Sequence, residues 1–80
     1  MTHTPHELAE DFADYRDQLA TLRQTDAHFH KLTEDYHALN RAIHRAETDV
    51  EPTDDLHMSE MRKSRMVLKD TIYARLRAAG

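Results

Sequence analysis

The apolar residues of this chain recur at alternating spacings of three and four, and this periodicity constrains its fold most strongly. One face of an α-helix repeats in this way, whereas a half-buried strand alternates every two residues. The first stripe contains Leu8, Phe12, Tyr15, Leu19 and Leu22; the second contains Phe29, Leu32, Tyr36, Leu39, Ile43, Ala46 and Val50; and the third contains Met58, Met61, Arg65, Leu68, Ile72 and Leu76. The sequence therefore predicts an all-α fold with three helices.

Helix-capping residues place the start of the first two predicted helices. Thr4 precedes Pro5 and is followed by Glu7 three residues later, which is a capping box, so the first helix is expected over about 5–23. Thr25 and Asp26 can each cap a second helix over about 26–49. The apolar stripe changes phase between these helices, which indicates a break or a kink but does not decide between two helices and one bent rod.

Pro52 marks the clearest interruption of the helical pattern. It ends the second helix and predicts a loop over about 50–53, after which Thr53 or Asp54 caps a third helix over about 54–78. Two helices of nearly equal length on a short loop form an antiparallel, coiled-coil-like helical hairpin, in which positions that sum to about 104 face each other. Residues 1–80 are thus expected to form one small domain, a hairpin preceded by an N-terminal helix.

Charge is distributed unevenly along the chain. Residues 1–55 contain 5 Lys or Arg against 13 Asp or Glu, whereas residues 56–80 contain 6 against 2. Opposite signs favour packing of the two parts on each other, within the chain or between copies. The alternative is that both are solvated helix faces whose signs happen to differ.

The composition argues against most catalytic and cofactor-binding architectures. The one glycine is Gly80 and there is no cysteine, so phosphate-binding loops, disulfides and cysteine nucleophiles are excluded. Glu34 and His37 have the spacing of a di-iron helix motif, but they lie on the side of the helix away from the apolar stripe. We therefore expect no enzyme activity, no metal, no cofactor and no small-molecule substrate.

Arg65 is the one charged residue within an apolar stripe. Asp35, Asn40 and the Tyr36 hydroxyl lie on the facing turn of the predicted hairpin and are candidates for a buried polar layer with it. Such a layer can select register or partner. Alternatively, the arginine packs its stem and extends its head to the edge of the groove.

Met66 and Tyr73 form a second apolar edge on the third helix, which the hairpin alone does not cover. The first helix can cover it from the same chain, as a three-helix bundle, or from another chain. The link between the first two helices is short for a tight reversal, so we favour an oligomer. The interface candidates are Leu8, Phe12, Tyr15, Leu19, Leu22, Met66 and Tyr73.

Nucleic acid is the alternative partner. The third helix carries basic residues, but they are spread around it, and the chain is acidic overall with a formal net charge of −4. The basic residues in question are Arg62, Lys63, Lys69, Arg75 and Arg77.

Two segments resemble a known family. Residues 61–73, MRKSRMVLKDTIY, are similar to the run L-K-K-x-R-L-x-L-K-D-E-I-Y of the YdcH-like family of small bacterial proteins, and residues 25–29, TDAHF, are similar to its S-D-x-H-F segment. The resemblance implies a helical hairpin in a cytoplasmic bacterial protein. It implies no activity, because that family is a domain of unknown function, and it assigns no catalytic or binding residue.

These observations lead to one functional expectation and one alternative. We expect a non-catalytic cytoplasmic oligomerisation or protein-interaction module that acts as a homo-oligomer or with a protein partner. No apolar run approaches the roughly 18 residues of a membrane span, so no membrane partner is expected. The alternative is a nucleic-acid-associated regulator that uses the basic third helix.

Overall fold

The computed structural model describes residues 7–48 and 54–79, and every regular element in these two segments is helical. The elements are α1 (Leu8–Asp11), the 3₁₀ helix η1 (Ala13–Tyr15), α2 (Arg16–Thr25), α3 (Ala27–Glu47) and α4 (Asp55–Ala79). The predicted all-α fold is confirmed. None of the helices in the described segments combines the length and the apolarity that crossing a bilayer requires.

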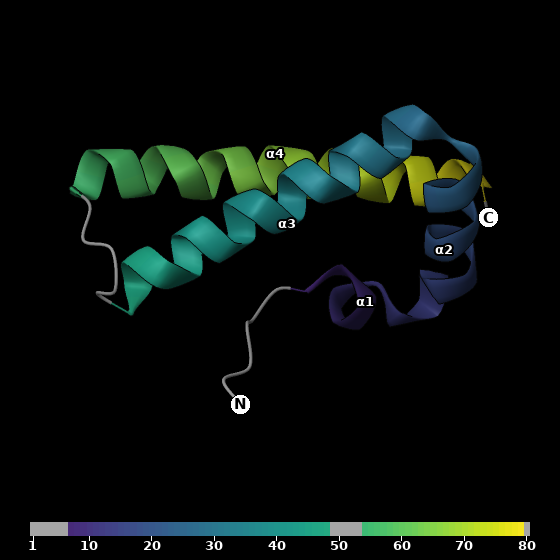
Figure 1. Ribbon diagram of the computed structural model, residues 1–80, viewed down its shortest axis with the longest axis horizontal. Coiled ribbons are helices and arrows are strands. Elements are labelled where there is room, and N and C mark those ends of the chain that lie inside the picture. The colour runs from purple at the N-terminus through teal and green to yellow at the C-terminus, as the bar shows by residue number, and fades with distance from the viewer. Residues whose placement is uncertain (1–6, 49–53, 80) are drawn as a thin grey trace.

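The two long helices, α3 and α4, form the antiparallel hairpin (Figure 1). Arg65 Nη1 lies 3.0 Å from Asn40 Oδ1, and Arg75 Nη1 lies 3.4 Å from His28 Nδ1. Both contacts fall within one position of the register predicted from the apolar stripes. The predicted connecting loop, with Thr53, lies outside the described residues, as do Thr4 and Pro5.

Aspartate side chains cap both long helices. Asp26 Oδ1 accepts a hydrogen bond from the Phe29 backbone N–H at 3.1 Å, and Asp54 Oδ1 accepts one from the His57 N–H at 2.7 Å. Each bond satisfies one of the amides that a helix leaves without an internal partner. Thr25, the other candidate cap, instead donates its hydroxyl to the Thr21 carbonyl within α2.

The first predicted helix is not continuous in the structure. At Phe12 the backbone leaves helical geometry, with φ −117° and ψ 45°, and at Tyr15 it does so again, with φ −117° and ψ 22°. The result is two short turns, α1 and η1, ahead of α2. The break lets the Phe12 ring stack on Tyr73 while Leu8 is also buried. Capping residues and apolar spacing cannot predict this break, because it depends on a contact with a residue far away in the sequence.

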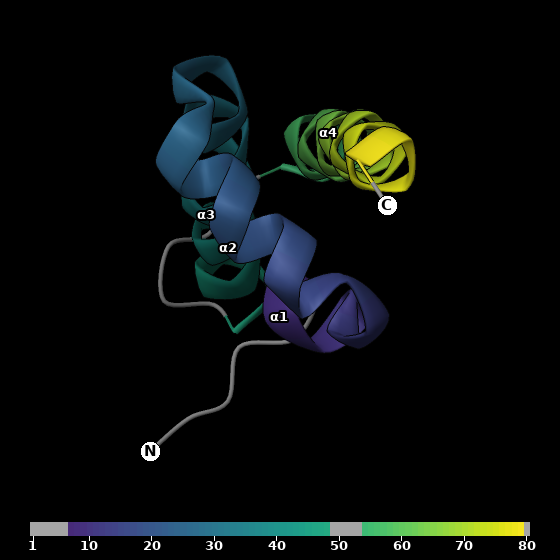
Figure 2. The ribbon, with the colours of Figure 1, turned by 90° about the vertical axis from the view of Figure 1, so that its right-hand side faces the viewer.

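A single extended residue separates α2 from α3. Asp26 has φ −128° and ψ 104°, so the two helices are distinct rather than one bent rod. Figure 2 shows α2 crossing the end of the hairpin at which α3 begins and α4 ends. We favoured an oligomer because packing the first helix on the hairpin of its own chain was expected to need a tight reversal between the first two helices. Because α2 crosses the hairpin instead of running back along it, the chain needs only a change of direction, which Asp26 supplies.

The hydrophobic core lies at this open end of the hairpin, where α1, α2, α3 and α4 meet. Its buried members are Leu8, Leu19, Phe29, Tyr36, Ile72 and Leu76, with Phe12, Tyr15, Leu22, Leu32 and Leu68 packed around them. In contrast, Met58 and Met61, near the loop end of α4, are only partly buried. The first helical segment therefore completes the core of its own chain.

The buried face of α3 differs from the predicted stripe at two positions. Thr33 and Asn40 are buried, whereas Leu32 and Leu39 are only partly buried. The shift occurs because α2 packs beside α4 on α3 and moves the centre of the buried face toward it. The Thr33 hydroxyl donates to the His30 carbonyl at 2.8 Å, which satisfies it without a second helix. Val50, the last residue of the predicted stripe, lies outside the described residues.

This packing predicts that two leucines of α4 differ sharply in their effect on stability. Leu76→Ala should lower the free energy of unfolding by about 2–5 kcal/mol, because Leu76 is fully buried and its truncation leaves a cavity. Leu56→Ala, the matched control on the same helix, should change it by less than about 0.5 kcal/mol because Leu56 is 72% exposed. Urea unfolding at submicromolar protein measures both, and equal losses would contradict the described core.

Candidate functional site

A cluster of polar and aromatic side chains closes the open end of the hairpin. Arg75 of α4 forms an ion pair with Asp26, contacts His28, and places its guanidinium carbon 5.7 Å from the centre of the Phe29 ring. Asp26 thus caps α3 and holds α4 with the same carboxylate. Three of these four residues lie in the TDAHF segment, so this part of the resemblance coincides with a helix cap and a cross-helix contact.

The surroundings of Asp26 favour its ionised form. The backbone N–H of Phe29 is the largest cause that lowers the pKa of Asp26, and Arg75 lowers it further, while partial burial opposes both. The carboxylate is therefore charged at neutral pH. Its contribution to stability is present above the unfolded-state pKa of aspartate and is lost as the pH falls through the lower folded-state pKa.

The predicted polar layer around Arg65 is formed in part. Asn40 is buried, with an exposed fraction of 1%, and its side-chain oxygen accepts the bond from Arg65. Tyr36 is fully buried next to this pair, and burial raises the pKa of its hydroxyl to about 12. Asp35 is not part of the layer, because its carboxylate lies on the exposed side of α3 and binds Lys31 at 3.2 Å.

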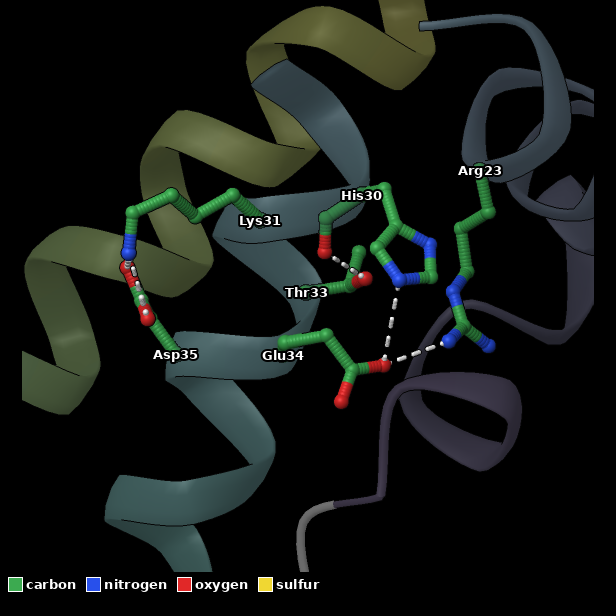
Figure 3. A network of polar contacts seen from close by, with 6 residues as sticks. All are labelled: Arg23, His30, Lys31, Thr33, Glu34 and Asp35. Atoms are coloured by element: carbon green, nitrogen blue, oxygen red, sulfur yellow. Dashed lines mark hydrogen bonds and ion pairs between the residues drawn. The ribbon is translucent and has the colours of Figure 1, made fainter. Parts of the chain in front are cut away.

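Figure 3 shows the Lys31–Asp35 pair together with the polar contacts between α2 and α3. Arg23 of α2 binds Glu34 Oε1 at 2.7 Å, and His30 Nε2 lies 3.8 Å from the same oxygen. Along the helix, His37 Nδ1 lies 3.6 Å from Glu7 Oε2. Glu34 and His37 thus lie on the side of α3 away from the hairpin core, as predicted, where Arg23 of α2 and Glu7 contact them while half of the Glu34 side chain stays exposed. Among the described residues no group of three His, Asp or Glu side chains is placed to hold a metal ion.

An aromatic cluster joins the first helical segment to α4. Phe12 stacks on Tyr73 with ring centres 5.4 Å apart, and Tyr15 meets Tyr73 edge-on at 5.8 Å. Burial, and then the Tyr73 hydroxyl, raise the pKa of Tyr15. Beside these rings, Lys69 binds Asp11 at 2.7 Å. The first helical segment therefore covers part of the Met66–Tyr73 edge from within the chain, as in one of the two arrangements predicted from the sequence, while Tyr73 stays 38% and Met66 58% exposed.

The open cavity beside the aromatic cluster, of about 480 Å³, is bordered by the carboxylates of Glu10, Asp11 and Asp14. The rings on its wall are already stacked on one another, and Lys69 lies 5.9 Å from the centre of the Phe12 ring. The aromatic surface of the cavity is occupied by contacts within the chain.

Cross-helix ion pairs join the basic and acidic parts of the sequence. Arg62 binds Glu47 at 3.1 Å, Lys69 binds Asp11, and Arg75 binds Asp26, so α4 is tied to three earlier segments. These contacts support the interpretation that the two oppositely charged parts pack on each other within the chain. Of the five basic residues considered for nucleic acid, Lys63 and Arg77 remain outside these ion pairs.

The exposed large apolar residues among those described all lie on α4. Leu56 is 72% exposed, Met66 58%, Val67 56% and Tyr73 38%, and we call the first three residues the outer surface of α4. Of the interface candidates, only Met66 belongs to it, since Leu8, Phe12, Tyr15, Leu19 and Leu22 pack in the core region and Tyr73 stacks on Phe12. Leu56 and Val67 were not among the candidates. Both lie opposite the core stripe of the third helix, so a helical projection of every apolar residue contains the signal.

Two substitutions of Asp26 separate its roles as cap and as ion-pair partner. At neutral pH, Asp26→Asn should destabilise the fold less than Asp26→Ala, because asparagine keeps the cap and loses the charge. The difference between wild type and Asp26→Asn should disappear as the pH falls through the lowered pKa of Asp26. Thermal unfolding across acidic pH measures this, and a difference that persists in acid would contradict the ion-pair role.

Arg65→Leu tests the polar layer against a matched substitution. It should lower the free energy of unfolding by about 1–3 kcal/mol, because the buried Asn40 oxygen loses its charged donor. Arg62→Leu removes an exposed ion pair from the same helix and should cost less than about 1 kcal/mol. Urea unfolding gives both values, and sedimentation of the Arg65 variant tests partner selection: an unchanged oligomeric state would contradict that role.

Comparison with protein families matches residues 29–76 to a family described as "Protein of unknown function (DUF465)". The matched range runs from the Phe29 end of α3 to Leu76 of α4, so it covers the hairpin and excludes α1 and α2. No curated protein and no solved structure matches the chain. Since the match spans more than half of the chain and follows its central architectural unit, the chain belongs to this DUF465 family.

Proposed function

We propose that this chain is a non-catalytic protein-interaction module that binds its partner through the outer surface of α4. One observation carries the proposal: the exposed large apolar side chains of the described residues gather on α4, on the side that the hairpin does not use. Burying such side chains against a partner is favourable by roughly 25 cal/mol per Å² of apolar surface before association costs are subtracted.

The way the chain uses its other apolar residues supports this assignment. The first helical segment supplies Leu8 and Leu19 to the core, so the apolar groups of α1 and α2 are consumed within the chain. The three most exposed large apolar side chains of the described residues lie on one helix, with Met66 and Val67 adjacent and Leu56 about 15 Å away along the axis. Exposed apolar residues that share one surface are characteristic of interaction sites, whereas singly scattered ones are normal.

The polar groups of the fold support a structural rather than a catalytic role. The buried Asn40 is bound to Arg65, and the pKa of Tyr36 is raised to about 12, away from the range useful for acid–base chemistry at neutral pH. The groups most engaged with one another, at Asp26 and Arg75, hold helix ends together. These polar residues therefore hold the two helices of the hairpin together.

The resemblance to the YdcH-like family supports a bacterial, cytoplasmic setting for this module. The alternative partner, nucleic acid, requires free cations along α4, and three of the five basic residues there are engaged in ion pairs. This favours protein over nucleic acid. The alternative predicts salt-dependent binding of duplex or single-stranded oligonucleotides, which the protein partner does not.

Site-specific photocrosslinking in the native host tests the proposed function without assuming which protein binds. A benzophenone amino acid at position 67, on the outer surface of α4, should yield one discrete crosslinked protein. The same group at position 38, on an exposed position of α3, is the control and should yield none. Met66→Lys should abolish the product from position 67. Equal products from both positions, or none from position 67, would contradict the proposal.

A further inference from the structure

We propose that the outer surface of α4 docks on the same surface of a second copy of this chain, with the two α4 helices antiparallel and a twofold axis beside Val67. The inference rests on the proposed function and names the partner. The surface is unoccupied along the helix: viewed down α4, Figure 2 shows α3 on one side and α1 below, and no helix on the remaining side.

Charged residues on this side of α4 are arranged for self-pairing. Lys63 lies four residues before Val67 and Asp70 three residues after it, and both are exposed. They lie about 10 Å apart along the helix axis, too far to bind each other. Neither forms an ion pair with any residue of the segments 7–48 and 54–79. A twofold axis between them places each opposite the other residue of the second copy.

The sign pattern selects the antiparallel arrangement. An axis midway between Lys63 and Asp70 places each of these residues opposite the other in an antiparallel copy, so that two Lys63–Asp70 pairs flank the centre. Glu60 and Arg77 take no part in this pairing, since the same axis places them opposite Tyr73 and Leu56, and the Arg77 guanidinium carbon lies 5.6 Å from the centre of the Tyr73 ring in its own chain. Parallel copies place Lys63 on Lys63 and Asp70 on Asp70, which is repulsive. Charged residues beside an apolar seam set orientation between helices in this way.

The apolar residues fit the same axis. Met66 and Val67 lie at its centre, where each meets the other in the second copy, and the seven-residue spacing of Lys63, Asp70 and Arg77 keeps this side facing the partner along the helix. Leu56 lies toward the end of the contact, opposite the Arg77 stem. Since the core of each copy is already closed, the two copies associate as folded units, and a contact along one helix gives a weak, reversible dimer.

A charge-swap cycle tests the partner and the pairing together. Sedimentation of the full chain from about 1 to 100 µM should show a monomer–dimer equilibrium. Lys63→Asp should raise the dimer dissociation constant about tenfold, because two attractive pairs become repulsive. The double variant Lys63→Asp with Asp70→Lys should restore it to within about threefold of wild type. A monomer at all concentrations, or no rescue by the double variant, would overturn the inference.

Disulfide trapping tests the orientation, since the chain contains no cysteine of its own. Val67→Cys should form a covalent dimer under mild oxidation, because the two copies of this position meet at the axis. Leu56→Cys should not, because its two copies lie about 30 Å apart and a disulfide spans less than about 7 Å between Cα atoms. Rapid crosslinking of Leu56→Cys would indicate parallel helices and overturn the antiparallel arrangement.

The two proposals fail in different ways. A position-67 photocrosslink to a different protein retains the interaction module and overturns self-pairing. A crosslinked product with the mass of two chains, lost in Lys63→Asp and recovered in the double variant, supports both. No product overturns both.

Discussion

The structure depends on the contact between Asp26 and Arg75. Asp26 is the one extended residue between α2 and α3, it caps α3 through the Phe29 amide, and it binds the arginine near the end of α4. These three properties fix where α3 starts, in which direction α2 leaves it, and how α4 lies beside both. The core forms at this end of the hairpin because four segments are brought together there. At the other end, α3 and α4 pack on each other, and no third helix of the described residues joins them there. Met58 and Met61 therefore remain partly exposed.

Periodicity determined the hairpin, because α3 and α4 are long enough for the three–four spacing to identify their faces without any tertiary information. The register of the two helices followed from the stripes and the proline loop, since the Arg65–Asn40 and Arg75–His28 contacts lie within one position of it. The N-terminal segment could not be derived in this way. Its path depends on the stacking of Phe12 on Tyr73, more than fifty residues away, and neither capping signals nor spacing carry that contact.

The same limit explains why the structure places several of the candidate residues differently from the prediction. Leu32 and Leu39 belong to the predicted stripe, which assumes one partner helix. α3 has two, so Thr33 and Asn40 are more buried than either leucine. Asp35 was grouped with Arg65 on sequence proximity, but it lies on the exposed side of the helix and binds Lys31. The residues of the first helix were expected at an interface between chains because their stripe is strongly apolar. A stripe indicates that a surface is covered and does not indicate by which chain.

Under the proposed function, α4 separates folding from association by its two sides. The inward side carries Ile72 and Leu76, which are buried by the chain itself, and its basic residues Lys69 and Arg75 bind acidic groups of earlier segments. The outward side carries Met66, Val67 and the charges that find no partner among the described residues, Lys63 and Asp70. Substitutions on the outward side leave the core contacts intact, so binding can change without loss of the fold. This separation is possible because α1 and α2, which lie outside the family match, complete the core that a two-helix hairpin leaves open.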